Sequence, residues 1–559
     1  MAAAAVAKGR GCAQSFLWHR RPAAVSKKLF QQPAHRGQSL DIPNEMVRCA
    51  SSGAGSRGVM YKSVEEQPDA VTTTITGAVP TWINGDLLRN GPGKFEVGND
   101  TYNHLFDGLS LLTRFNISNG KVTYQSKFQR SNSYTKAMEH NRIVVSEFGT
   151  MAHPDPCLSL LGRFMARFKP QREYSDNCNV NLAFVGDQCY AMTESRVLRK
   201  IDPRTLDTLD KVNLADTVAV HTATAHPHMD PDGTVYNMGS HFAKKTMYNI
   251  ITVPPPEPGM TEDPMSKASI LCSIPSTETY PSYYHSFSMT DNYIVFLEQP
   301  LFLNLLRMRM HMLFQTGFQK VMQYDEKKPA RFHIARWDTG ELLPQKFVAD
   351  PFFCFHQVNA YEEDGHVVVD LSTYEDGKIV QTINLENLRK GVETEVGTAK
   401  RFVLPVEKEK KSGINLNTLE NSKTTAVLRD DDTVYCTPEV ISDETIEFPK
   451  VNYEKFNGKP YQYFYGIGGT DLELMKVNTR TATSQRWHEE GCCPSEPIFV
   501  NAPNSTSEDD GVVLSAVNDL REGKSPFLLV LDARDFKEVA RAEIKAEVPF
   551  GFHGMYVSN

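Results

Sequence analysis

Four histidines with the ligand chemistry of a metal site lie far apart in the chain, in unlike settings. They are His226 in AHPH, His285 in YYHSF, His356 in CFHQVNAYE and His553 in FGFHGMY. Neutral imidazoles are good ligands for first-row metals such as iron, copper or zinc and poor ligands for Mg²⁺ or Ca²⁺. No Cys-x-x-Cys or His-Glu-x-x-His motif accompanies them. They therefore form one site only if the fold gathers distant strands at a point.

The AHPH segment offers two ligand candidates, since His226 and His228 point to the same face of an extended strand. Ligating imidazoles usually donate their second N–H to a carboxylate. An acid inside an apolar run is costly unless it is paired, which makes three glutamates candidate partners, each with a surface strand end as the alternative. They are Glu194 in YAMTES, Glu447 in IEFPKVNY and Glu496 in PSEPIFV.

The elements that must position these side chains are β-strands. Short runs of Val, Ile, Tyr, Phe and Thr follow Asp, Asn and Gly turn signals throughout residues 61–559. Clear examples are residues 118–124, 230–239, 290–298, 362–371, 430–436 and 508–517. Few amphipathic helices interrupt them, so the fold is predicted to be all-β.

The spacing of the turns favours one all-β architecture. Turn positions 232, 291, 364, 432 and 510 are 59, 73, 68 and 78 residues apart, which suits four-stranded blades with insertions and gives about seven blades. Stacked β-sandwiches would fit this spacing too. The histidines are 59, 71 and 197 residues apart, or about one, one and three such units, and the innermost strands of propeller blades meet on the axis.

Composition sets further bounds. Hydrophobic residues make up 40% and charged residues 23% of the 559 residues, and no run of eighteen uncharged apolar residues predicts a membrane-spanning helix. The ten cysteines are scattered without a disulfide framework. A net charge of −8 argues against a nucleic-acid partner.

The first forty residues carry seven Lys or Arg and no Asp or Glu, the composition of a mitochondrial transit peptide. The alternative is an N-terminal tail that carries no targeting signal. We therefore expect a transit peptide (1–40), a linker (41–60) and a single β-propeller domain (61–559).

Several motifs together resemble the carotenoid cleavage oxygenase family. Beside the four histidine segments and SEPIFV stand LLRNGPGKFEVG (87–98), HLFDG (104–108), SDNCNVN (175–181) and EFPKVNY (447–453), in the family's order and spacing. The resemblance runs from about residue 61 to the C-terminus. RFHIARWDTGELLP (331–344) and PFGFHGMY (549–556) are most similar to the eccentric-cleaving, mitochondrial branch of vertebrates.

The resemblance implies a seven-bladed β-propeller with Fe(2+) on its axis and a loop and helical cap that forms a substrate tunnel. The catalytic iron ligands would be His226, His285, His356 and His553, with His228 a neighbour. Glu194, Glu447 and Glu496 would each orient one histidine, and Thr193 would narrow access to an open metal position.

The implied reaction adds both atoms of O₂ across the 9′,10′ double bond of carotenes and xanthophylls. Its products are an apo-10′-carotenal and an ionone. Because a polyene offers few polar handles, aromatic tunnel walls are expected to select the bond. The candidates by motif match are Phe106, Phe148, Tyr283, Phe355 and Tyr374.

Departures from the family pattern bear on substrate choice. Leu105 replaces a Trp that the carotenoid cleavers usually have, and Leu158 replaces a Lys. His221 and Thr222 replace Asn-Gly, while Ser195 and Arg196 alter a TETN motif. Central 15,15′ cleavage to retinal, retinoid isomerohydrolase activity and a non-enzymatic carotenoid-binding protein are the alternatives.

The carotenoid lives in membranes, so peripheral membrane contact is expected. Two segments that mix Leu, Phe and Met with Arg suit the headgroup layer: residues 154–168, which include the acylation candidate Cys157, and residues 300–314. Buried packing is the alternative. The expected location is the mitochondrion, peripheral to the inner membrane, with the cytosol as the alternative.

Overall fold

The computed structural model describes residues 57–152, 159, 175–305, 307–308, 317–408, 411–469 and 471–559. Its contacts divide the chain into residues 1–49 and residues 50–559, and the description below concerns the second unit. The expected transit peptide, Cys157 and Leu158 lie outside the described residues, as does almost all of segment 154–168. In the part of the chain that is described, no helix is both long and apolar enough to cross a membrane.

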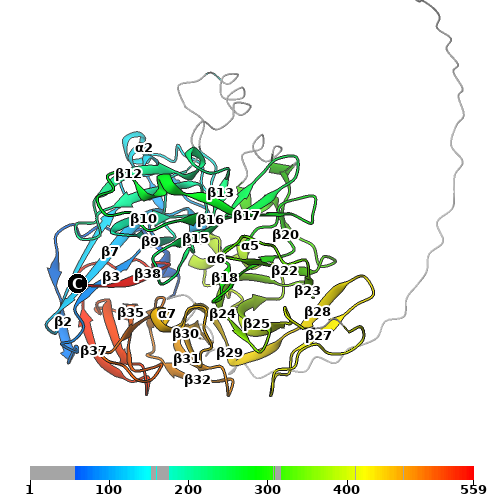
Figure 1. Cartoon of the computed structure of the whole chain (residues 1–559). Helices are drawn as coiled ribbons and strands as arrows, with labels where there is room; N and C mark the ends of the chain where they lie inside the picture. The colour runs from blue at the N-terminus through cyan, green and yellow to red at the C-terminus, as the bar shows by residue number, and fades with distance from the viewer. Residues whose placement is uncertain are drawn as a thin grey trace, which may run out of the picture. The chain divides into compact units, whose positions relative to one another are not determined.

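The described residues between 57 and 559 fold into seven blades (Figure 1), whose strands are antiparallel except for one parallel pair in blade 4. This confirms the propeller prediction. Four of them supply the candidate ligands. Blade 1 pairs β38 (Gly554–Ser558), β3 (Gly85–Arg89), β7 (Leu109–Ser118), β8 (Lys121–Phe128) and β1 (Val71–Thr72). Blade 3 pairs β13 (Thr222–Ala223) and β14 (His228–Met229) with β15 (Val235–His241), followed by β16 (Met247–Val253) and β17 (Ser269–Pro275). Blade 4 pairs β18 (Ser288–Met289), β19 (Tyr293–Glu298), β22 (Ala330–Arg336), β23 (Lys346–Ala349), β28 (Thr433–Thr437) and β27 (Thr425–Leu428). Blade 5 pairs β24 (Phe353–Glu363), β25 (His366–Tyr374), β26 (Thr398–Leu404) and the first part of β29 (Glu439–Lys450).

The other three blades complete the ring. Blade 2 pairs β9 (Asn181–Val185), β10 (Gln188–Met192), β11 (Val197–Ile201) and β12 (Thr208–Asn213). Blade 6 pairs the last part of β29 with β30 (Tyr463–Gly468), β31 (Glu473–Asn478) and β32 (Thr483–Trp487). Blade 7 pairs β33 (Cys492–Pro494) and β34 (Ile498–Asn501) with β35 (Gly511–Asp519), β36 (Phe527–Asp532), β37 (Glu538–Glu543) and β2 (Thr74–Gly77).

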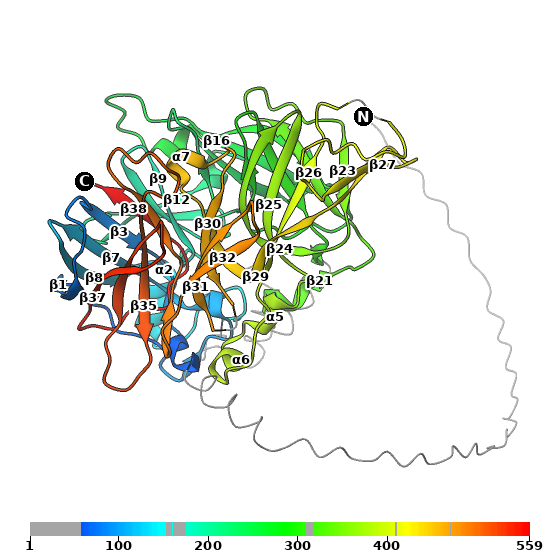
Figure 2. The same cartoon turned by 90° about the horizontal axis from the view of Figure 1, so that it is seen from below.

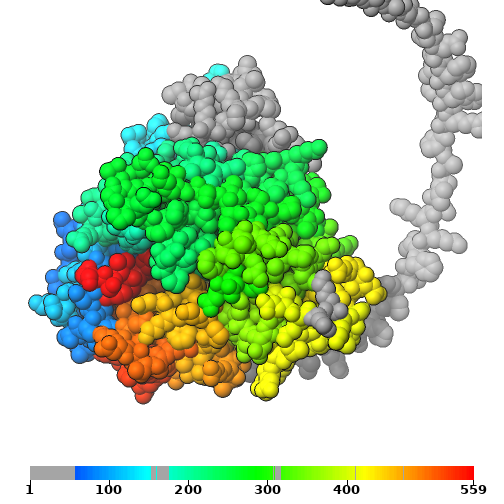
Figure 3. Space-filling view, viewed as in Figure 1, coloured from blue at the N-terminus to red at the C-terminus, as the bar shows by residue number. Residues whose placement is uncertain are grey.

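Strands from the two ends of the described chain close the ring. β3 pairs with β38, with Leu87 opposite Tyr556, and β2 pairs with β37, with Ile75 opposite Ala542. Figure 2 shows β38 beside β3, and in Figure 3 the red C-terminal residues lie against the blue ones. Each pairing places chain segments more than 450 residues apart in one sheet.

Apolar residues on both faces of the inner strands explain why these segments form blades. Successive side chains of a strand point to opposite faces, and in β3 the neighbours Leu87 and Leu88 enter different apolar clusters. The core is therefore a set of apolar layers between blades. Blades 1 and 7 share one such layer, which includes Leu87, Phe115, Leu514 and Val530. The strand-like runs predicted from the sequence are confirmed as β8, β15, β19, β25, β28 and β35.

Short helices and loops add to the blades. The 3₁₀ helix η2 (Leu105–Asp107) and α6 (Leu385–Arg389) share an apolar cluster with α2 (Asn132–His140). The short helix α5 (Ile379–Thr382) packs in another apolar cluster, through Ile379 and Val380. Residues 301–303, expected as part of a membrane-facing element, instead form strand β20 (Leu301–Leu303). It pairs with β21 (Met322–Tyr324), and Leu301 and Phe302 are buried. Packing thus explains the start of segment 300–314, of which 306 and 309–314 lie outside the described residues.

Candidate metal centre

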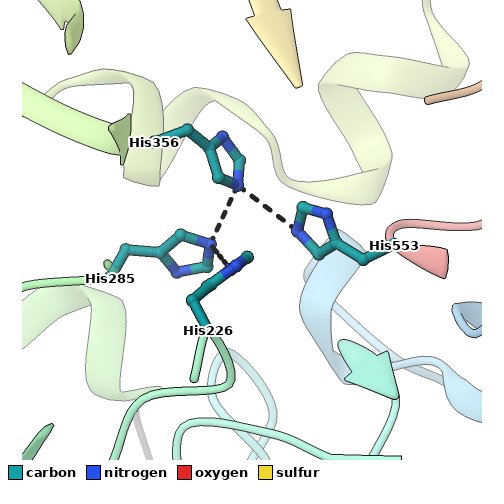
Figure 4. Close-up of side chains that lie close together, drawn as sticks. All are labelled: His226, His285, His356 and His553. Atoms are coloured by element: carbon teal, nitrogen blue, oxygen red, sulfur yellow. Dashed lines mark hydrogen bonds between the residues drawn. The ribbon is translucent and has the colours of Figure 1, made fainter. Parts of the chain in front are cut away.

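The four candidate histidines meet at one point from four blades. His226 lies between β13 and β14 of blade 3, and His285 precedes β18 of blade 4. His356 belongs to β24 of blade 5, and His553 directly precedes β38 of blade 1. Their ring nitrogens form a cluster in which the four potential ligand atoms all lie within 4.8 Å of one another (Figure 4).

The Nε2 atoms face each other. Nε2 of His285 lies 2.9 Å from that of His226 and 3.2 Å from that of His356. Nε2 of His356 lies 3.3 Å from that of His553. Figure 4 shows these contacts as dashed lines between rings that converge from different sides.

Three carboxylates hold the opposite edges of the rings. Nδ1 of His285 lies 2.5 Å from Oε1 of Glu194. Nδ1 of His356 lies 2.6 Å from Oε2 of Glu447, and Nδ1 of His553 lies 2.7 Å from Oε1 of Glu496. Because an ionised carboxylate only accepts hydrogen bonds, each Nδ1 donates. The neutral imidazole then presents its Nε2 lone pair to the centre.

This arrangement fits a bound cation. Lone pairs that face each other across about 3 Å repel unless a proton or a metal ion lies between them. Imidazole–metal bonds of about 2.1 Å place ligand atoms at right angles to each other about 3.0 Å apart, close to the distances found here. Four neutral nitrogen donors and no first-layer carboxylate suit a borderline first-row metal.

Burial keeps the centre ready for a metal. It lowers the pKa of His226 and His553 well below the ordinary value, and the neighbouring rings lower it further. Burial also lowers the pKa of His356, partly opposed by Glu447. Burial would raise the pKa of Glu447, but His356 and the backbone N–H of Phe448 outweigh it, so its pKa is lowered. These shifts favour neutral imidazoles at His226, His356 and His553, as metal ligands must be.

His228 lies outside the cluster. Its Nε2 donates to the carbonyl oxygen of Phe287 at 2.9 Å, and its Nδ1 lies 3.1 Å from the hydroxyl of Tyr453. The strand is interrupted between β13 and β14, so the two histidines of AHPH do not share one face as an unbroken strand would require. The backbone N–H of His226 instead donates to the hydroxyl of Thr224 at 2.8 Å.

The five aromatic candidates lie in a single apolar cluster next to the histidines. Tyr283, Phe355 and Tyr374 belong to its buried part, and Phe106 and Phe148 pack against it. The ring of Phe355 meets that of His285 edge-on at a centroid distance of 5.4 Å. Other members include Leu301, Met322, Phe353, Ile379 and Val380. Thr193 follows β10 directly and is half-buried beside Glu194.

Sequence reasoning missed several residues around the centre. The hydroxyl of Tyr283 donates to Oε1 of Glu194 at 2.9 Å, which gives this tunnel candidate a second contact. Phe448 places its ring 5.4 Å from those of both His356 and His553. Lys450 contacts Glu496 at 3.1 Å. Phe448 and Lys450 lie in the EFPKVNY motif, of which only Glu447 was predicted to contribute to the centre.

Fold and centre together define a β-propeller built around a four-histidine cluster with three carboxylate partners. The model of the family described as Retinal pigment epithelial membrane protein matches residues 61–558. The chain is 43% identical to a "Carotenoid-cleaving dioxygenase, mitochondrial" of Mustela putorius furo, over 89% of this chain and 96% of that protein. It is 42% identical to a "Beta,beta-carotene 15,15'-dioxygenase" of Rattus norvegicus, over 89% and 91%.

Among solved structures, a cobalt-substituted apocarotenoid oxygenase of Synechocystis shares the fold, with a TM-score of 0.73 at 22% identity. The alignment covers 90% of this chain and 99% of that one. The chain belongs to the Retinal pigment epithelial membrane protein family, that of the carotenoid cleavage oxygenases. The family and the enzyme class, a carotenoid dioxygenase, are thereby confirmed.

Proposed function

We propose that the chain is a non-haem iron(II) dioxygenase that cleaves carotenoids at the 9′,10′ double bond. The observation that carries the proposal is the convergence of His226, His285, His356 and His553, with three of their Nδ1 atoms fixed by carboxylates. The relatives named for carotenoid cleavage support the substrate class.

Bound iron would supply the redox chemistry that O₂ requires and that a polyene without acidic protons cannot draw from acid–base residues. In the overall reaction one C=C bond breaks and each of its carbons gains one atom of O₂ as a carbonyl oxygen. The four histidines would hold the metal. Glu194, Glu447 and Glu496 would keep their tautomers and orientation, and Thr193 would limit access beside Glu194.

The aromatic cluster would hold the polyene and exclude water. Phe355 joins the two parts of the site, since its ring contacts His285 while its backbone continues to His356. Phe106, Phe148, Tyr283 and Tyr374 extend the apolar wall away from the metal. Contact with such a wall can fix which double bond reaches the centre, so regiochemistry would be set here and not by the ligands.

Central cleavage at the 15,15′ bond is the second candidate. It is favoured by the rat relative, whose identity of 42% is almost that of the mitochondrial relative at 43%. The four-histidine centre serves either bond equally, because the ligands contact the metal and not the ends of the polyene.

Labelled O₂ separates the two. Iron-loaded protein is incubated with β-carotene and with a xanthophyll under ¹⁸O₂, and the products are identified by mass spectrometry. An apo-10′-carotenal and an ionone, each with one label, are expected. Retinal as the sole product would contradict the 9′,10′ assignment, and the absence of any cleavage would contradict the dioxygenase assignment.

We further propose a mitochondrial location, peripheral to the inner membrane, with contact through 154–168 and the latter part of 300–314. The acid-poor residues 1–40 and the mitochondrial relative support the address. A fluorescent reporter fused to residues 1–40 should enter mitochondria, whereas the same fusion with its seven Lys and Arg replaced by Gln should stay in the cytosol. Cytosolic fluorescence of both would overturn the address.

A further inference from the structure

The three carboxylates at the centre differ in the charge of their other partners. Oε1 of Glu194 also accepts from the hydroxyl of Tyr283 at 2.9 Å. Oε1 of Glu447 accepts from the hydroxyl of Ser372 at 3.2 Å. Both of these partners are neutral. Glu496 differs, because its Oε1 also lies 3.1 Å from the ammonium group of Lys450.

The backbone is bent so that Lys450 can make this contact. Residues 447 and 450 are three apart, so they would point to opposite faces of a regular strand. In β29, however, Glu447 pairs with Ile467 and Lys450 with Tyr465. Three residue steps along β29 therefore lie opposite two along β30. Such a bulge re-aims side chains. It is accompanied by a φ of +52° at Phe448, a conformation that non-glycine residues rarely adopt.

One four-residue segment therefore serves two ligands. Its first residue, Glu447, accepts the Nδ1 proton of His356. Its last residue, Lys450, binds the carboxylate that accepts the Nδ1 proton of His553. The side chain of Glu496 is fully buried, whereas that of Lys450 is 30% exposed, so the charge of Lys450 keeps partial hydration while it meets a carboxylate that has none.

We propose that Lys450 is a positioning residue that weakens the hold of Glu496 on the Nδ1 proton of His553. His553 thereby becomes a less basic metal ligand than His285 and His356. An acceptor shared with a cation draws less on the second donor, because the cation withdraws electron density from the shared oxygen. The inference rests on the proposed metal centre.

This role predicts that removal of Lys450 strengthens metal binding, whereas the loss of an orienting residue weakens it. Removing Lys450 leaves Glu496 bound to His553 Nδ1 and to the backbone N–H of Gly554 at 2.9 Å. His553 then becomes a stronger donor, and the centre loses a nearby positive charge, so both effects strengthen the binding of a divalent cation. A residue that merely held Glu496 in place would have the opposite effect, because outer partners that only orient ligands cost about 10–100-fold in metal affinity when lost.

The test measures metal binding without turnover. Apo-protein is titrated with Co²⁺ alone, in competition with a chelator, and the ligand-field spectrum is recorded. Lys450→Met should bind Co²⁺ about tenfold more tightly than the unchanged protein and shift the spectrum toward a stronger ligand field. Lys450→Arg, which keeps the charge, should bind nearly as the unchanged protein does. Lys455→Met serves as a control for the loss of a lysine charge, since the side chain of Lys455 is exposed and its ammonium contacts Ser505.

A second background separates charge from folding. In Glu496→Gln protein no carboxylate is shared between Lys450 and His553, so only the loss of the nearby positive charge remains, and adding Lys450→Met should strengthen Co²⁺ binding clearly less than it does in the otherwise unchanged protein. Equal or weaker binding by Lys450→Met in the otherwise unchanged protein would overturn the inference. Failure of the unchanged protein itself to bind Co²⁺ or Fe²⁺ would instead overturn the proposed metal centre, so the two failures are distinct.

Discussion

The candidate metal centre and the aromatic cluster lie side by side but are built in different ways. The centre takes one ring from strand β24 and three from segments that flank strands of three other blades. It fixes three of the four rings with directional hydrogen bonds of 2.5–2.7 Å. The aromatic cluster combines strands β20, β21 and β24 with the short helix α5 and loop residues such as Phe148, and it is held by apolar contact. Directional bonds demand particular side chains, whereas apolar packing accepts many of similar volume. The same scaffold can therefore keep one chemistry while its substrate changes.

The largest expected effect is the loss of a ligand. His356→Ala should abolish metal binding at micromolar concentration and reduce turnover more than about a thousandfold, because it removes a ligand and deprives the buried Glu447 of its imidazole donor. Metal content by mass spectrometry and product formation check this. His228→Ala is the matched control and should retain metal, since both ring nitrogens of His228 are bonded elsewhere. Full metal retention by His356→Ala would contradict the assignment of His356 as a ligand, and with it the difference between the two regions.

A smaller effect is expected from an orienting carboxylate. Glu496→Gln keeps the size but weakens the acceptor for His553 Nδ1, so metal affinity should fall about 10–100-fold. The control is Glu298→Gln, which alters another buried glutamate–histidine pair, with Nε2 of His333 3.0 Å from its carboxylate. Equal metal loss in both variants would mean that the effect is general destabilisation.

The aromatic cluster should respond in product identity and not in metal content. Phe355→Leu removes the ring beside His285 at a cost of about 1–2 kcal/mol in stability. We expect the ratio of 9′,10′ to other cleavage products to change about threefold with unchanged metal occupancy. Chromatography of the products measures this. Phe402→Leu, at a buried site in another cluster, should leave the ratio as it is, and an unchanged ratio in Phe355→Leu would contradict the assignment.

The smallest effect concerns pH. His104 is fully buried against Phe106 and Phe148, and burial lowers its pKa to about 4. Its contribution to stability is present above the unfolded pKa of about 6.5 and is lost as the pH falls toward 4, by about 3 kcal/mol in all. The midpoint of thermal unfolding should therefore fall more steeply between pH 6.5 and 4 than in His104→Gln.

Comparison with that variant is needed because Asp107 acts in the opposite sense. Burial raises its pKa to about 7, so protonation of Asp107 stabilises the folded chain as the pH falls from 7 toward its ordinary value. Identical pH profiles for the unchanged protein and His104→Gln would contradict the assignment of the loss to His104.

The two regions also differ in how far the sequence could predict them. Strand patterns predicted an all-β fold, because alternation and turn residues are local signals. The turn spacing fitted both a propeller and stacked sandwiches, and the family resemblance favoured the propeller. The position of Lys450 could not be predicted, since strict alternation places it opposite to Glu447 and only the bulge at Phe448 reverses that. Likewise the composition of the apolar run 301–303 suits contact with lipid and with protein equally. Its pairing with β21 depends on residues about twenty positions later in the chain, so local sequence does not reveal it.

Closure of the ring has a consequence for assembly. His553 directly precedes β38, and β38 takes its place only by pairing with β3, more than 450 residues earlier in the chain. Contacts of such long sequence separation form late in folding, because a large loop must close before they stabilise anything. The imidazoles of His226, His285 and His356 can come together while the circle of blades is still open, but that of His553 cannot. Tight metal binding would thus require that β38 has paired with β3. The bound ion would in turn stabilise that pairing against reopening.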